Sequence, residues 1–400
     1  MQTQIEQESA KRRRSRDSRE AELHRRQRER LTEQMQYSEE MQRDHNRMRY
    51  SMGLPVQFNA VSQYGKGLTP LLLPDAANLQ SWHVSTLGMT QAQTLLPPGA
   101  SPSISWSTDL QQAIPFQCTT SAGVRGVATY ALSIDGGATT FQSGLTATTI
   151  SVPLLGNTLT FASGTYIAGA YLGLVKQLTN QAINNPAATL LGRATDSSKP
   201  VLTPNAQNGF QGIFNTSGNA MYDATSGWAA SVASDPTGAG VNFQWFIVGS
   251  IDSAAPSAVR ALMCMAQKAS ATPVYFLGAL NGTNVYRMQR TNDAGTNALQ
   301  SAGALTTAFK LYTVQVSKSA LQNVTLWVNK TKVINNLAFG TGPITLDNVG
   351  LFGETRGTSD GGASNANRAT VLELTTYNTV SSAADTDSIQ NYFIGKYNLP

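Results

Sequence analysis

The chain has 400 residues, of which 41% are hydrophobic and only 13% are charged, and its formal net charge is +5. The first 50 residues hold 13 basic and 10 acidic side chains, which leaves 16 and 14 for the remaining 350, so we do not expect the body to bind nucleic acid in bulk. The chain has a charged N-terminus and no run of about 18 apolar residues, so we expect neither a membrane-spanning helix nor a secretory signal.

Residues 1–52 predict a long helix that anchors the protein. Gly and Pro are absent before Gly53, and the good helix formers Gln, Glu, Arg and Met dominate. Because the apolar stripe is thin, we expect this helix to pair with copies of itself, with a trimer as the first expectation, or to lie in a groove of a larger assembly. The segment "KRRRSR" at residues 11–16 is strongly basic. Two interpretations of this basic run stay open: it is a solvated end of the helix, or it docks on an acidic surface or on nucleic acid. The expected anchor residues are Arg12, Arg13, Arg14, Arg16, Leu31 and Met35.

After residue 52 the composition predicts a mainly β body. Gly, Ser, Thr, Asn and short β-branched runs replace the helix formers, and the periodicity becomes alternating. Residues 53–110 contain several prolines and few strand signals, which predicts an extended arm. Residues 111–194 predict a small β-sandwich with a hairpin turn at Asp135–Gly137, followed by an exit helix in "LGLVKQLTNQAINN".

Residues 195–400 predict a second, larger β-domain. About ten short strands bounded by Gly, Asn and Asp are typical of two packed antiparallel sheets of the jelly-roll kind. The segment "ADTDSIQNYFIGKYNL" predicts a C-terminal amphipathic helix. Its expected inward side chains are Ile389, Tyr392, Phe393 and Tyr397.

The last half of the chain resembles a known lectin family. The order "TDSSKPVLTPNAQNGFQGIFNTSGNAM", "LYTVQVSKSALQNVTLWVNKTKV" and "LELTTYNTVSSAADTDSIQNYFIGKYNL" is similar to that of concanavalin A-like (laminin-G-like) lectin domains. Such domains are common in tailed-phage virion proteins, and the resemblance implies that context for this chain. The family often places Phe-Asp-Gly after the strand that "GFQGI" matches. Here the sequence reads "FNTSGNAM", which puts an inherited metal or sugar contact in doubt.

The sequence does not predict a catalytic centre. The three histidines, His24, His45 and His83, all precede the two β-domains, which removes mechanisms that need a histidine base there. Glu373 lacks a carboxylate two or four residues further on, so the paired acids of a glycosidase strand are missing and a structural, hydrogen-bonded role is expected. We therefore predict no enzyme activity and no cofactor, with a glycosidase built from distant aspartates as the enzyme alternative.

A few side chains are candidates for binding. Asp223, Asp347 and Asp360 lie in predicted loops and are the calcium candidates, although turns without metal are the competing interpretation. Tyr222 and Trp228 could stack on a sugar, while core packing is the alternative. Two single cysteines, Cys118 and Cys264, are expected to be buried free thiols.

These observations predict a non-enzymatic structural component of a tailed-phage particle. It would be a fibre or appendage, anchored by its N-terminal helix to neck, tail or capsid proteins of the virion and displaying its β-domains outward. The first alternative is an adhesin that binds a host surface glycan. The second is a capsid decoration protein, which would differ by a copy number in the hundreds.

Overall fold

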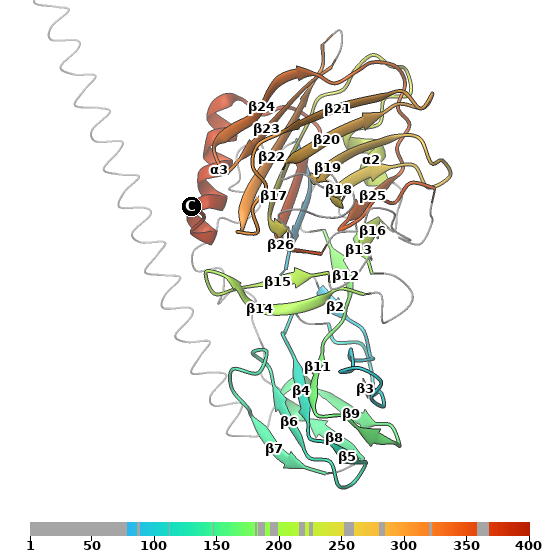
Figure 1. Ribbon diagram of the computed structural model, residues 1–400, viewed down its shortest axis with the longest axis vertical. Coiled ribbons are helices and arrows are strands. Elements are labelled where there is room, and N and C mark those ends of the chain that lie inside the picture. The colour runs from blue at the N-terminus through green and yellow to red at the C-terminus, as the bar shows by residue number, and fades with distance from the viewer. Residues whose placement is uncertain are drawn as a thin grey trace, which may run out of the picture. The chain divides into compact units, whose positions relative to one another are not determined.

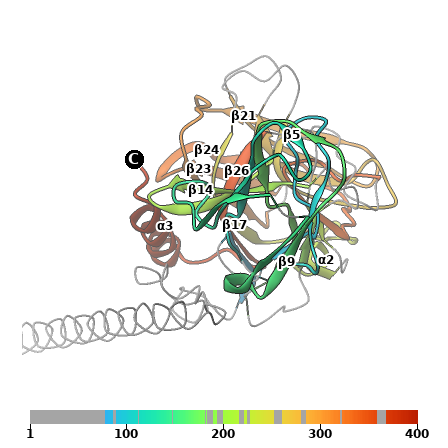
Figure 2. The same ribbon diagram turned by 90° about the horizontal axis from the view of Figure 1, so that it is seen from below.

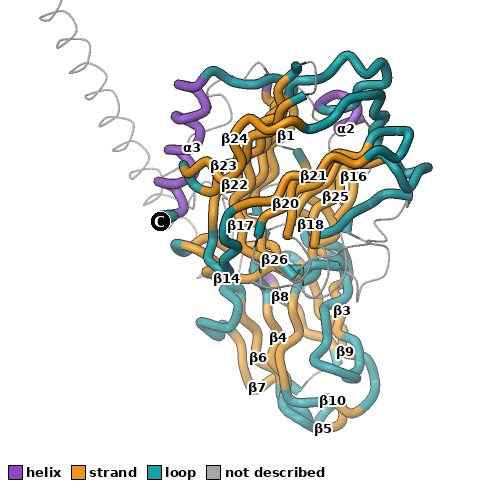
Figure 3. The backbone as a smooth tube through the Cα atoms, turned by 45° about the horizontal axis from the view of Figure 1, so that its top comes forward, coloured by secondary structure: helices purple, strands orange, loops and turns teal. Residues whose placement is uncertain are grey.

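The computed structural model describes residues 78–400, except for 86–88, 112, 147, 181, 183–188, 193–198, 216–220, 224–226, 252–259, 280–284, 320–321 and 358–367. The predicted N-terminal helix, its anchor residues and the first part of the predicted arm lie outside the described residues. Residues 67–400 form one compact unit. Strands are the dominant secondary structure of the described chain, as Figure 3 shows in orange.

The first large sheet has eight antiparallel strands, and its central strands are the most buried. All nine residues of β17 (Phe243–Ile251) are buried, because one face of the strand points into the core and the C-terminal helix lies over the other. This explains the continuous apolar run "FQWFIVGSI", where a strand exposed on one face would alternate. The other strands are β1 (Leu79–Val84), β14 (Val201–Gln207), β15 (Phe210–Phe214), β22 (Lys310–Ser317), β23 (Asn323–Val328), β24 (Thr331–Ala338) and β26 (Ala369–Tyr377).

Neighbouring strands of this sheet follow the order β14-β15-β26-β17-β22-β23-β24, and β1 also pairs with β26. The second large sheet has nine antiparallel strands (Figure 1). In spatial order they are β2 (Met89–Gln91), β12 (Val175–Thr179), β13 (Thr189–Leu191), β16 (Met221–Asp223), β25 (Asn348–Leu351), β18 (Arg260–Ala266), β19 (Val274–Ala279), β20 (Tyr286–Thr291) and β21 (Asn297–Ala302).

The main hydrophobic core lies between these two sheets. Trp245 and Val314 from the first sheet belong to the same buried cluster as Met263, Tyr275 and Met288 from the second. The prediction of a mainly β body with two packed antiparallel sheets is therefore confirmed.

A smaller β module with its own core occupies residues 104–172. Tyr130, Phe161, Tyr166 and Tyr171 are packed together in this core, with Tyr130 and Phe161 stacked at 3.9 Å between ring centroids. The elements are β3 (Ile104–Trp106), β4 (Gln117–Thr120), β5 (Gly123–Val124), β6 (Tyr130–Ser133), β7 (Gln142–Leu145), β8 (Thr149–Val152), a 3-10 turn η4 (Pro153–Leu155), β9 (Asn157–Phe161), β10 (Thr165–Tyr166) and β11 (Gly169–Leu172).

The structure differs from the sequence prediction in two segments. The predicted exit helix is wrong over Val175–Thr179, which form β12. A β-bulge between Val175 and Gln177 brings Val175 and Leu178 to the buried side at a three-residue spacing that imitates helical periodicity. The predicted arm also contributes β1, β2 and β3, so residues 79–84, 89–91 and 104–106 belong to sheets. Their pairing partners are distant in sequence, and local pattern does not reveal them.

Two helices complete the described elements. α2 (Gly227–Val232) is short, and α3 (Ala383–Tyr397) is the predicted C-terminal helix. Ile389, Phe393 and Tyr397 are fully buried, and Figures 1 and 2 both place α3 against the eight-stranded sheet. Among the described residues, no helix is both long enough and apolar enough to cross a membrane.

Candidate functional site

The two aromatic candidates from the sequence lie in different environments. Trp228 is completely buried, stacks on His83 at 4.8 Å between ring centroids and donates its indole N–H to Thr376 at 2.9 Å. It is therefore a core residue, and its burial rules out stacking on a sugar from solvent. Tyr222 on β16 is partly exposed.

The acidic candidates do not assemble into a metal site. Asp223 is buried and accepts the backbone N–H of Trp228 at 3.3 Å, whereas Asp347 accepts the N–H of Lys268 at 2.7 Å. Asp360 lies outside the described residues. Within the described part of the chain, no three His, Cys, Asp or Glu side chains are grouped to hold an ion.

Glu373 has the structural role that its sequence context predicts. Its carboxylate is fully buried on β26 and faces α3, where it accepts from Lys396 Nζ at 2.7 Å and from the Tyr397 hydroxyl at 2.5 Å. The indole N–H of Trp82 on β1 donates to its other oxygen. Three donors and a buried counter-charge are what a carboxylate needs to remain in a core. This group therefore fastens α3 and β1 to the sheet.

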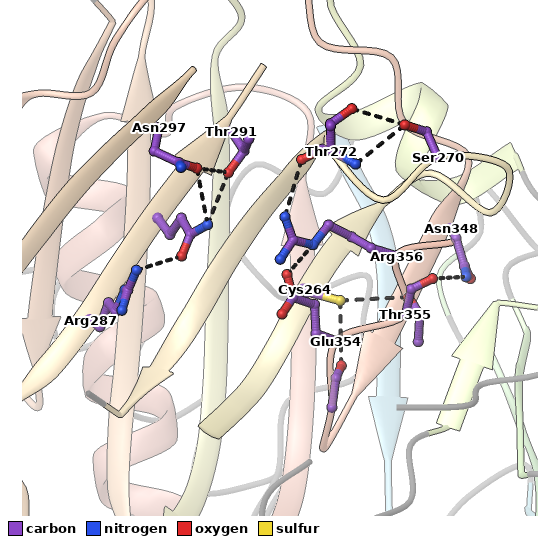
Figure 4. Close-up of polar contacts among 12 residues, drawn as sticks. Cys264, Ser270, Thr272, Arg287, Thr291, Asn297, Asn348, Glu354, Thr355 and Arg356 are labelled. Atoms are coloured by element: carbon purple, nitrogen blue, oxygen red, sulfur yellow. Dashed lines mark hydrogen bonds and ion pairs between the residues drawn. The ribbon is translucent and has the colours of Figure 1, made fainter. Parts of the chain in front are cut away.

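A row of polar side chains lies on the outer face of β20 and β21. Tyr286 and Met288 of β20 point into the main core, so the alternating residues Arg287, Gln289 and Thr291 point to the opposite face. Register pairs Thr291 with Asn297 on β21, and Figure 4 shows these side chains together. We call Arg287, Gln289, Thr291, Asn297, Glu354 and Arg356 the arginine face.

Hydrogen bonds orient this row toward Arg287. Thr291 Oγ1 donates to Asn297 Oδ1 at 2.5 Å, and Gln289 Nε2 donates to Thr291 Oγ1 at 2.9 Å. The Gln289 amide is thereby turned so that its Oε1 accepts from Arg287 Nη2 at 2.9 Å. Arg287 Nε is itself buried and has no hydrogen-bond acceptor among the described residues, and Gly278 on β19 lies opposite Arg287 without a side chain. The guanidinium is thereby held in place on a partly exposed side chain.

A second guanidinium belongs to the same face. Arg356 forms an ion pair with Glu354, whose carboxylate is buried, and its Nη1 donates to the carbonyl of Thr272 at 3.3 Å (Figure 4). Partial burial lowers the pKa of Arg287, with Glu354 opposing this effect and Arg356 adding to it. A guanidinium is a cation at neutral pH. Two cations against one carboxylate leave the arginine face with a net positive charge.

The cysteines match their prediction. Cys118 and Cys264 are buried and free. Cys264 Sγ donates to the carbonyl of Gly353 at 3.4 Å, and burial, with Glu354 nearby, raises its pKa to about 11. Burial raises the pKa of Cys118 to about 12. Both thiols are therefore protonated and inert at neutral pH.

Sequence reasoning missed the arginine face. The alternation in "YRMQRT" could have suggested that Arg287 and Gln289 share a face, but Arg290 breaks the pattern because it is buried. Glu354 and Arg356 lie more than sixty residues away in the chain and join the face through the pairing of β25 with β18 and of β18 with β19. Chemically, the arrangement can bind an anion through Arg287 and hydroxyl groups through Asn297.

No protein-family model matches the chain, and no curated protein matches its sequence. Several solved structures show partial similarity. The CBM40 of the Ruminococcus gnavus IT-sialidase, bound to alpha2,3 sialyllactose, is 17% identical, with a TM-score of 0.35 over 45% of this chain and 95% of that chain. The NanB sialidase of Streptococcus pneumoniae is 15% identical, with a TM-score of 0.34 over 47% of this chain and 28% of that chain.

The binding domain of Botulinum neurotoxin DC, in complex with rat synaptotagmin II, is 8% identical, with a TM-score of 0.37 over 54% of this chain and 48% of that chain. All three superpositions cover only part of this chain.

Proposed function

We propose that this protein is a non-catalytic adhesin whose arginine face binds a glycan that carries a carboxylate. The observation that carries the proposal is the guanidinium of Arg287, which belongs to a partly exposed side chain and is oriented by Gln289. A guanidinium offers a planar pair of N–H donors that matches a carboxylate.

The surroundings of Arg287 support a glycan as the carrier of that carboxylate. Asn297 is exposed, and amides both donate to and accept from hydroxyl groups. Leu299, which pairs with Gln289 on the same face, is 48% exposed and offers apolar contact to the C–H face of a sugar ring. A polar site beside one exposed apolar side chain suits an amphipathic ring better than a purely apolar ligand.

The proposal of a non-catalytic role rests on the two glutamates of the body. Glu354 is paired with Arg356 and Glu373 with Lys396, so neither is placed as a free acid or nucleophile. A glycosidase would need two carboxylates about 5–10 Å apart on either side of a substrate. Failure of the full chain to cleave any glycan that it binds is the expected result.

We place this adhesin on a tailed-phage particle, as a fibre or appendage of the concanavalin A-like type attached through its N-terminal segment. The support is the sequence, namely the motif order of the last half and the contrast between a charge-rich first 50 residues and a low-charge body. Immunogold electron microscopy of purified particles with antibody against residues 201–400 tests this placement. Label at the neck or tail is expected. Label over the whole capsid would favour a decoration protein, and unlabelled particles would contradict a virion role.

Glycan binding is tested with an array of sialylated, uronic-acid and neutral oligosaccharides, followed by calorimetric titration of the glycans that bind. We expect acidic glycans to bind the full chain, and Arg287→Gln to weaken this binding by at least about tenfold, since a charged hydrogen-bond partner contributes about 1.5–3 kcal/mol. Arg287→Lys should bind acidic glycans little better than Arg287→Gln does, because one ammonium group does not reproduce the paired N–H donors of a guanidinium.

The matched control is Arg125→Gln, the same substitution at an exposed arginine of the small module. It should leave binding unchanged. Equal binding by wild type and Arg287→Gln, with both proteins folded by circular dichroism, would overturn the assignment of the arginine face.

A further inference from the structure

A groove lies on the other large sheet, outside the arginine face. Its volume is about 800 Å³, its floor is the outer face of β22–β24, and its wall is one side of α3. Val324 and Leu326 of β23 point into the main core, so Thr325 and Trp327 point into the groove. On α3 the lining residues recur at three- and four-residue spacing and form one helix face: Ala383, Thr386, Asp387 and Gln390.

The backbone of the floor is irregular beside Trp327. The pairing of β23 with β24 shifts register on both sides of Leu326, and Asn336 adopts a left-handed conformation with φ of 52°. Its N–H is fixed by Thr325 Oγ1 at 3.1 Å. As a result Asn335 and Asn336 are both exposed and both line the groove, where a regular strand would have turned one of them away. Bulges of this kind recur next to binding sites because they redirect side chains.

The groove combines an aromatic ring with amides and few charges. Trp327 is partly exposed, and Lys332 Nζ lies 5.5 Å from its ring centroid without an acidic partner among the described residues. Lys330 is paired with Asp387 at the rim, and this hydrogen bond lowers the pKa of Asp387. The lining therefore carries one uncompensated charge, much less than a channel for single-stranded nucleic acid requires.

We propose that this groove is a second binding site, which takes an oligosaccharide independently of the arginine face. Trp327 stacks on the C–H face of one ring, and the amides of Gln315, Asn335 and Asn336 bond its hydroxyl groups, because an amide offers a donor and an acceptor as a hydroxyl does. The volume is of the size of small-molecule sites in proteins, about 300–1,000 Å³. A second site on the opposite sheet makes the chain bivalent, so a glycan-coated surface is bound more tightly than a single glycan in solution.

The proposal is tested with the full chain and the same oligosaccharide array, by titration of each binding glycan into three variants. Trp327→Ala is expected to weaken one set of glycans by at least about tenfold and to spare those lost in Arg287→Gln. Trp327→Phe should retain part of that affinity, because it preserves a ring to stack on. Phe141→Ala is the matched control, since it removes a partly exposed aromatic side chain of the small module, outside both proposed sites. Thermal unfolding of every variant verifies the fold, which should persist because Trp327 points away from the core.

Three outcomes would overturn the second site. The first is that no oligosaccharide binds to the Arg287→Gln variant, which would mean that all binding takes place at the arginine face. The second is that the Trp327→Ala variant binds every glycan with the affinity of the wild type. The third is that the groove binds only single-stranded oligonucleotides and that this binding disappears as the salt concentration rises, which would make the groove a nucleic-acid site. If Arg287→Gln loses all binding and Trp327→Ala loses none, the groove is contradicted and the arginine face is supported. The two proposals can therefore be contradicted by different results.

Discussion

At the scale of single residues, the buried pair of Glu373 and Lys396 is the most consequential feature. Both side chains are at most 1% exposed, and they join β26 to α3, the wall of the groove. Neither residue was identifiable as a partner from the sequence, because they are 23 positions apart on different elements. The sequence did indicate that Glu373 lacks a catalytic companion, and the hydrogen bonds to Lys396, Tyr397 and Trp82 explain its presence in an apolar strand.

We predict a large loss of stability when one member of this pair is changed. Glu373→Gln should lower the free energy of unfolding by about 3–5 kcal/mol, because the buried ammonium of Lys396 loses its counter-charge. The double variant Glu373→Gln with Lys396→Met should lose less than the sum of the two single changes. Urea unfolding of the four proteins gives the coupling between them, and a coupling near zero would contradict the role of this pair.

At the scale of elements, the loop between β6 and β7 shows how a sequence turn acquires a tertiary role. The sequence predicts left-handed glycines there, and Gly136 and Gly137 do have φ of 71° and 94°. The contact with β14 is visible only in the fold, since a Cβ on Gly136 would lie 2.0 Å from Cγ of Pro204. Gly136 is thus constrained twice, once by its own backbone and once by a strand of the large sheet.

We predict different costs for two glycines with the same φ of 71°. Gly144 also has φ of 71°, but a Cβ there would meet nothing within 4 Å. Gly144→Ala should therefore cost only the left-handed strain, about 1–2 kcal/mol. Gly136→Ala should cost clearly more, because the ring of Pro204 must also move. Thermal unfolding of both variants measures the difference, and equal losses would show that the contact with Pro204 adds nothing.

At the scale of the whole molecule, the chain divides near residue 66, and the described cores belong to residues 67–400. We predict that residues 67–400 expressed alone unfold cooperatively at the same temperature as the full chain.

We also predict that this fragment fails to enter phage particles when it replaces the full chain. Differential scanning calorimetry and blotting of purified particles check the two results. Incorporation at normal copy number would contradict the anchoring role of the N-terminal segment.

The sequence by itself determined the β class of the body and the C-terminal helix, because alternation, β-branched runs and helical spacing are local properties. The tertiary structure alone decided the rest. It buried Trp228 in the core, made a bulged strand of the predicted exit helix and recruited β1 into a sheet with β26, nearly 300 positions later. Both proposed sites belong to this second group. Glu354 and Arg356 act electrostatically on Arg287, and Trp327 lines one groove with α3. Both arrangements arise from strand pairing and helix packing between distant segments, which no local pattern records.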